Sequence, residues 1–194
     1  MAERRRLAAL AVPVLVLPAA IALTDAHLAA GPAALVISTL AATLAVSGLA
    51  LQPLLAAVAG VRLRWHRVLG TVTFALVLAH VGGLFLVSAE DTRFALSPDG
   101  PTRARMALLA TIALAVVVVL GASRARLPMS TFTWRVLHAF FAALVVILGV
   151  GHAVITDGAL DGVGTPVLLL LGGAALGGIA YAAIRRAQRF PARR

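Results

Sequence analysis

Residues 134–152 read WRVLHAFFAALVVILGVGH, a stretch in which His138 and His152 stand fourteen residues apart with an almost wholly apolar run between them. About 20 apolar residues are enough for one helix to cross the roughly 30 Å hydrocarbon core of a membrane. Ionisable residues inside such helices are rare, and by default they indicate a functional site. The stretch therefore predicts a membrane-spanning helix that carries two functional histidines.

A second stretch repeats this spacing. Residues 64–80 read RWHRVLGTVTFALVLAH, so His66 and His80 are also fourteen residues apart. Fourteen helical residues rise about 21 Å and return to within roughly 40° of the starting direction. The two histidines of each helix are therefore expected to share one face, one of them near each surface of the membrane.

The composition supports a membrane protein. The chain has 194 residues, of which 61% are hydrophobic and 12% are charged. Soluble domains carry about 25% charged residues, so this chain has too few to cover a soluble surface. We predict an all-α fold, a single transmembrane domain of residues 1–194 built as a six-helix bundle. The expected spans are 7–24, 32–60, 66–88, 105–121, 134–155 and 165–184.

The basic residues predict how the bundle is oriented. All seventeen cations are Arg, and fourteen of them fall on one side of the six expected spans. Because cytoplasmic loops are enriched in basic residues, both termini are predicted to be cytoplasmic, in a multi-pass protein of the inner (plasma) membrane. Nucleic acid is not an expected partner, since the arginines stand at the ends of apolar stretches. Segment 7–24 has an alternative interpretation as a cleaved signal peptide.

This orientation pairs the histidines across the two helices. Both helices are expected to run outward from the cytoplasm, so His66 lies level with His138, and His80 level with His152. Two imidazoles facing each other suit the two axial positions of a haem iron. Zinc or copper sites need three or four ligands, and the chain has no cysteine. We therefore expect two b-type haems, one in each leaflet.

Other residues near the histidines have two interpretations each. Arg67 and Arg135 stand beside the inner pair, where they would neutralise haem propionates or act as ordinary membrane anchors. Glycines near the histidines would admit a macrocycle or would serve close helix packing; these are Gly70, Gly82, Gly83, Gly149 and Gly151. Phenylalanines would contact a porphyrin or fill the core; these are Phe74, Phe140 and Phe141.

Residues 64–80 and 134–152 resemble the ferric reductase-like transmembrane domain. This superfamily includes ferric reductases, NADPH oxidases and the haem subunit of bacterial methionine sulfoxide reductase systems. The resemblance covers about residues 36–155 most clearly. It implies six helices with haem ligands on the third and fifth, and matches His66 and His138 to the inner iron ligands and His80 and His152 to the outer ones.

The resemblance also implies a separate electron donor. Ferric reductases usually continue into flavin and nicotinamide domains, whereas this chain is expected to have no such soluble domain. Electrons would come from a flavin reductase or a quinol, with a flavin or quinone bound here or on a partner. The acceptor would be ferric iron, oxygen or an external protein.

The expected function is thus that of a b-type cytochrome passing electrons across the bilayer, as an oxidoreductase component. Three alternatives remain: a non-catalytic membrane subunit or small transporter whose histidines are structural, a haem-based sensor, and a quinol-linked subunit of a larger complex.

Overall fold

The computed structural model describes residues 2–57, 63–156, 158 and 160–189. Within these ranges every regular element is a helix, so the predicted all-α fold is confirmed. The helices are α1 (Ala2–Ala22), α2 (Ala26–Ala29), α3 (Ala33–Ala57), α4 (Leu63–Val87), α5 (Ala89–Ala95), α6 (Thr102–Ala122), α7 (Thr131–Val154) and α8 (Gly164–Arg189).

Five of the described helices are long and apolar enough to cross a membrane, and they make the chain a multi-pass membrane protein. They are α3, α4, α6, α7 and α8, each within a few residues of an expected span. The first expected span, 7–24, is also helical, but its apolar stretch Ala11–Ala22 is shorter than the other five. A sixth crossing remains a prediction. Residues 58–60, at the end of the second expected span, lie outside the described residues.

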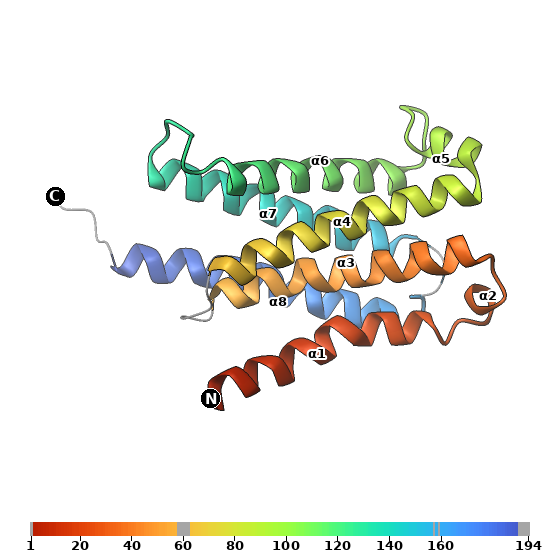
Figure 1. Ribbon diagram of the computed structural model, residues 1–194, viewed down its shortest axis with the longest axis horizontal. Helices are drawn as coiled ribbons and strands as arrows, with labels where there is room; N and C mark the ends of the chain where they lie inside the picture. Colours follow the sequence, from red (N-terminus) through yellow and green to blue (C-terminus); the bar gives the residue numbers. More distant parts are fainter. Residues whose placement is uncertain (1, 58–62, 157, 159, 190–194) are drawn as a thin grey trace.

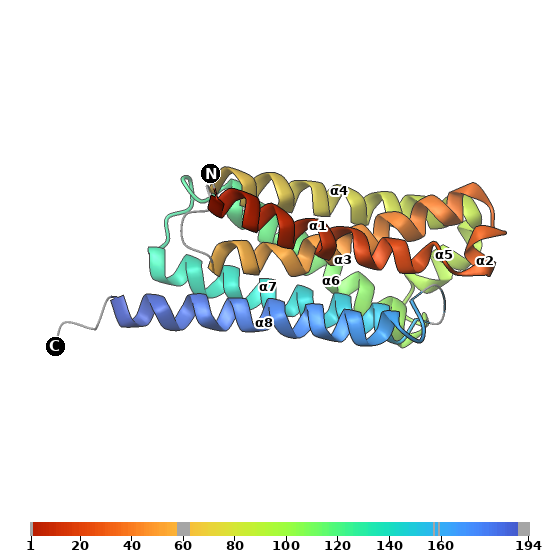
Figure 2. The same cartoon turned by 90° about the horizontal axis from the view of Figure 1, so that it is seen from below.

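Helix α3 is the centre of the bundle. It packs closely against α4 and α8 and also contacts α1, while α6 and α7 form a second close pair (Figures 1 and 2). Half of its membrane-spanning stretch is buried, compared with 11–22% of the other four. The other helices therefore expose most of their apolar side chains, which is the arrangement expected where lipid replaces water.

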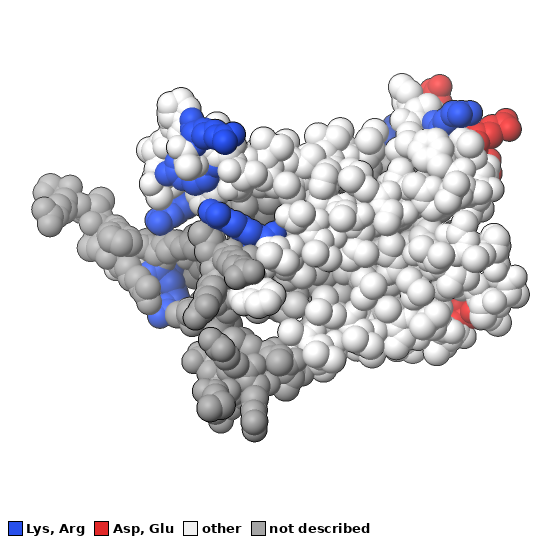
Figure 3. All heavy atoms as spheres, viewed as in Figure 1, with Lys and Arg blue, Asp and Glu red and all other residues white. Residues whose placement is uncertain are grey.

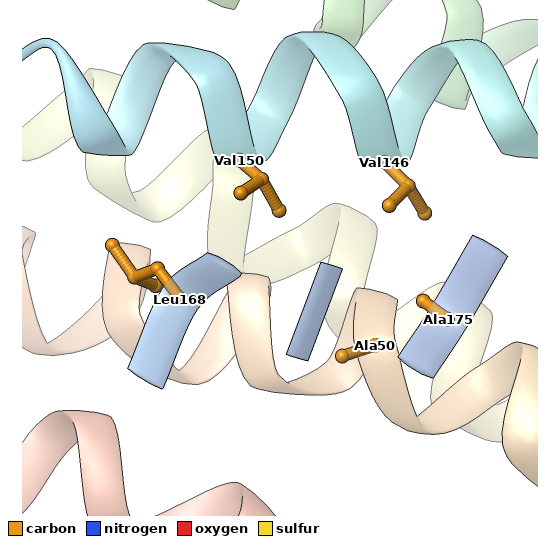
Figure 4. Close-up of a cluster of buried hydrophobic side chains, with 5 residues drawn as sticks. All are labelled: Ala50, Val146, Val150, Leu168 and Ala175. Atoms are coloured by element: carbon orange, nitrogen blue, oxygen red, sulfur yellow. The ribbon is translucent and has the colours of Figure 1, made fainter. Parts of the chain in front are cut away.

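A cluster of buried apolar side chains joins α3, α7 and α8. Ala50 of α3 faces Val146 and Val150 of α7, with Leu168 and Ala175 contributed by α8 (Figure 4). Gly172 brings α8 close to this cluster, since a Cβ atom there would stand 3.3 Å from two carbons of Val150. The cluster fixes the position of α7, the helix that carries His138 and His152.

Two glycines set the separation of α3 and α4. A Cβ atom on Gly83 would lie 2.7 Å from the Cβ of Ser38, and one on Gly48 would collide with the Oγ1 of Thr73. Small residues at such crossings let two membrane helices approach closely. The contact at Gly83 places α3 directly beside His80.

The charged side chains lie at the two ends of the bundle. Figure 3 shows arginines gathered at the end where α1 begins and α8 ends, and the described acidic side chains at the opposite end. This separation agrees with the Arg asymmetry of the sequence, although several residues behind that prediction lie outside the described ones: Arg62, Asp157, Arg193 and Arg194.

Two short helices were not expected from the sequence, α2 and α5. The excursion after α4 contains α5, which begins after Ser88, whose side chain accepts a hydrogen bond from the backbone N–H of Asp91 at 3.2 Å. Glu90 and Asp91 in its first turn and Arg93 in its last turn suit the helix dipole.

Candidate functional site

The side chains of His66 and His138 meet between α4 and α7. Their ring centroids are 6.1 Å apart and their planes are inclined by 62°. The two helices are not among the closely packed pairs of the bundle, so these rings reach toward each other across a space between α4 and α7. We call them the inner pair, because they lie at the arginine-rich end.

A buried polar atom in the inner pair lacks a partner. The Nδ1 atom of His66 is buried, and although the backbone of Gln52 lies nearby, no hydrogen bond of normal geometry reaches it. The Gln52 side chain instead lies over Gly70, one turn further along α4, where a Cβ atom would stand 3.2 Å from its Oε1. A buried polar atom without a normal hydrogen bond is costly, so the surroundings of His66 differ from those of His80 and His152.

The ring of His138 lies against an indole. Trp134, one turn earlier on α7, stacks on it with centroids 4.9 Å apart and planes inclined by 18°. Offset stacking of aromatic rings at this separation is favourable. Trp134 therefore covers one face of the His138 ring.

His80 is held by α3. Its Nδ1 atom lies 3.1 Å from the backbone oxygen of Ser38 and 2.9 Å from the Ser38 Oγ. The Ser38 hydroxyl in turn donates to the backbone oxygen of His80 at 2.9 Å. Since a carbonyl oxygen can only accept, Nδ1 must carry the proton in this bond. The Nε2 atom of His80 is then left with a free lone pair.

His152 is held in the same way by α6. Its Nδ1 atom lies 2.9 Å from the backbone oxygen of Arg103 and 3.4 Å from the Thr156 Oγ1, whose hydroxyl donates to the backbone oxygen of His152 at 2.7 Å. The carbonyl of Arg103 again places the proton on Nδ1, so Nε2 keeps its lone pair. We call His80 and His152 the outer pair; they are close enough to interact electrostatically.

Two features limit what these residues form without an added group. Among the described residues, no three His, Cys, Asp or Glu side chains lie together as a metal site. A cavity of about 300 Å³ opens between α7 and α8 beside Met106 of α6, and none of the four histidines lines it. The cavity is therefore separate from the four histidines, and the described residues form no three-ligand metal site.

The family described as ferric reductase like transmembrane component matches residues 30–149, more than half of the chain. The chain belongs to this family. The searches of curated proteins and of solved structures returned no match. As a ferric reductase-like protein, the chain is a membrane component of the electron-transfer type. The match includes α3, α4, α6 and most of α7.

The remaining residues singled out in this ferric reductase-like chain lie in different surroundings. Arg67 and Arg135 are both exposed at the inner end. Phe74 and Phe141 pack against the buried cluster of Ala113, Leu114 and Val145, whereas Phe140 is 59% exposed. Of these five named residues, the two packed phenylalanines fill the core.

The glycines also differ from one another. Gly83 is needed for the approach of α3, whereas a Cβ atom on Gly82 would meet nothing within 4 Å. A Cβ on Gly149 would make an ordinary 3.5 Å contact with Leu49, and one on Gly151 would collide with the end of the Met106 side chain. Helix packing thus accounts for Gly83, and the structure gives Gly82 no packing role.

Sequence reasoning missed two partners of the outer pair. Ser38 is fully buried inside an apolar span, and a hydroxyl in that position is a signal that it bonds across helices. The partner of His152 is the backbone carbonyl of Arg103. A main-chain acceptor cannot be recognised from a pattern of side chains in the sequence.

Proposed function

We propose that this ferric reductase-like protein is a b-type membrane cytochrome, in which the inner pair holds one haem and the outer pair a second. Each haem iron would take one imidazole from α4 and one from α7. When bound, the iron supplies a carrier for single electrons that alternates between its ferric and ferrous states.

The observation that carries the proposal is the state of the outer pair. Imidazoles that bind metals usually donate their second N–H to a backbone carbonyl or a carboxylate, which fixes the tautomer and the ring orientation. His80 and His152 both do this, from different helices and toward different partners, Ser38 and Arg103. Both rings therefore keep Nε2 available to bind a metal ion, and we infer that they share one.

The inner pair fits the same role by distance. An imidazole nitrogen lies about 2 Å from a bound metal ion. Two rings that face one metal from opposite sides therefore have centroids roughly 6 Å apart. The centroids of His66 and His138 are 6.1 Å apart, so little movement is needed for both to reach one iron.

The remainder of the chain would insulate the path and set its direction. Apolar side chains of the five long helices would keep water from the haems. The arginine-rich end would face the cytoplasm, with both termini there and α1 as a sixth span. Arg67 and Arg135 would pair with haem propionates. A flavin protein or a quinol would deliver electrons at the inner end, and an acceptor outside the membrane would receive them.

The hydrogen bonds of His80 and His152 also fit a second function. They join α4 to α3 and α7 to α6, which is what histidines would do in a non-catalytic membrane subunit where they only connect helices. In that case Nε2 would have no metal to bind, and the protein would be colourless.

Haem content separates the two functions. Full-length protein purified from haem-replete cells is expected to show a reduced b-type absorption spectrum with two haems per chain. His80→Ala and His152→Ala should each leave one haem, because a six-coordinate iron needs both imidazoles. A colourless preparation, or single variants that keep the full haem content, would contradict the cytochrome and favour the structural subunit.

A further inference from the structure

The inner pair has a third ring beside it, and that ring is tied to a different part of the fold. Trp134 stacks on His138, as described above. The indole Nε1–H donates to the backbone oxygen of Leu120 at 2.9 Å. Leu120 lies in the last turn of α6, whose final carbonyls have no partner within their own helix. The indole therefore connects the end of α6 to the ring of His138.

A cation adds a further contact to the same indole. The Arg124 guanidinium carbon lies over the Trp134 ring, 5.6 Å from its centroid, within the range of a cation–π interaction. The guanidinium also donates to the Thr131 Oγ1 at 3.0 Å, in the first turn of α7. A backbone carbonyl and a cation thus both restrict the plane of the indole.

The other tryptophan of the chain provides an internal comparison. Trp65 precedes His66 at the same end of the bundle, but it is 61% exposed, as expected for a residue of the interfacial belt. Trp134 is partly buried; it stacks on His138, donates a hydrogen bond to Leu120 and contacts Arg124. The two tryptophans therefore lie at the same end of the bundle in different surroundings.

We propose that Trp134 is a positioning residue of the inner site: it fixes the rotation of the His138 ring, and through it the redox potential and the low-spin spectrum of the inner haem. This inference rests on the proposed function. Contacts that orient a ligand histidine are among the means by which a protein would tune a bound haem. The outer site, held by hydrogen bonds to Ser38 and Arg103, is not affected by Trp134.

The first test uses the haem-loaded protein. His80→Ala leaves only the inner haem, so electron paramagnetic resonance and a redox titration on this background report the inner site alone. Adding Trp134→Leu should broaden and shift the low-spin signal and change the midpoint potential, whereas Trp134→Phe, which can still stack, should change them less. Trp65→Leu is the matched control and should change neither.

Each outcome of this test is informative. On the His80→Ala background, loss of the inner haem on adding Trp134→Leu also supports the inference, provided that adding Trp65→Leu leaves this haem bound. An unchanged signal and potential in Trp134→Leu would overturn it. In the otherwise unaltered chain, loss of both haems in Trp134→Leu would overturn it as well, because the indole is proposed to act on one site only.

A second test needs no haem, so it stands even where the proposed function fails. In full-length protein from haem-limited cells, Trp65→Phe leaves Trp134 as the single tryptophan. Adding His138→Ala should then raise its fluorescence, because a stacked imidazole quenches an indole. The same His138→Ala change in a Trp134→Phe background, where only Trp65 emits, should have no effect. Equal responses in the two backgrounds would contradict the stacked arrangement.

Discussion

The inner and outer histidine pairs occupy equivalent positions on α4 and α7, yet the protein holds them by different means. Both rings of the outer pair donate a hydrogen bond from Nδ1 to a main-chain carbonyl of a neighbouring helix. In the inner pair, His138 lies on the face of Trp134 and the buried Nδ1 of His66 has no hydrogen bond. The outer site is thus marked by two hydrogen bonds to main-chain carbonyls, and the inner site by the stacking of Trp134 on His138.

This difference has a chemical consequence. A hydrogen bond from Nδ1–H to a carbonyl makes an imidazole a stronger donor to its metal. Both ligands of the outer iron are therefore expected to be strong donors, because each donates from Nδ1 to a carbonyl. The following substitutions are ordered from the largest expected effect to the smallest.

Gly83→Val should remove the outer haem and leave the inner one. The new side chain would collide with Ser38 and separate α3 from α4 where His80 is held, so the hydrogen bond to Nδ1 would be lost. Haem content per chain is the measurement. Gly82→Val is the matched control, because nothing lies within 4 Å of a Cβ atom there. Equal haem content in the two variants would show that the contact of α3 with α4 does not support the site.

Ser38→Ala should weaken the outer site without abolishing it. The hydroxyl is lost, but the backbone oxygen that accepts from His80 remains. Removing a second-shell partner typically costs about 10- to 100-fold in metal affinity; with the carbonyl retained, we expect the lower end of that range and a higher potential for the outer haem. Spectroscopic redox titration measures both.

The control for Ser38 is another buried hydroxyl on the same helix. Ser47 is fully buried and donates to the backbone oxygen of Thr43 within α3. Ser47→Ala should leave both potentials unchanged. A similar shift in the two variants would mean that the outer site responds to α3 in general and not to the bond with His80.

Thr156→Val should have the smallest effect. The Thr156 Oγ1 lies 3.4 Å from the Nδ1 of His152, too far for a strong hydrogen bond, while Arg103 supplies a carbonyl at 2.9 Å. Both haems should remain bound with unchanged potentials in the same titration. A shift as large as that of Ser38→Ala would show that the hydroxyl, and not the Arg103 carbonyl, holds His152.

Much of the fold could be predicted because membrane helices are encoded by long apolar runs. The five long spans follow directly from such runs, and the fourteen-residue spacing of the histidines follows from helix geometry. The helix α5 was missed although Ser88 and the acidic residues after it form an N-cap pattern that predicts a helix start. Short helices in excursions of this kind depend on capping and not on hydropathy.

The candidate ligand histidines could be predicted from the sequence, but the residues that hold them in place could not. Histidines inside apolar spans are conspicuous, but Arg103 acts through a main-chain oxygen, and Trp134 looks like an ordinary interfacial residue until its stacking on His138 is known. Distinguishing Gly82 from Gly83 likewise required knowing which face of α4 meets α3. These properties arise from tertiary packing, which residue spacing alone does not specify.

The pairing of the histidines is tested most directly by counting haems in double variants. His66→Ala with His138→Ala should leave one haem per chain, and so should His80→Ala with His152→Ala, because each combination empties a single site. The crossed combination of His66→Ala with His152→Ala should leave none, since it removes one ligand from each site. A crossed variant that retains as much haem as the two within-pair variants would contradict the account of two level pairs shared between α4 and α7.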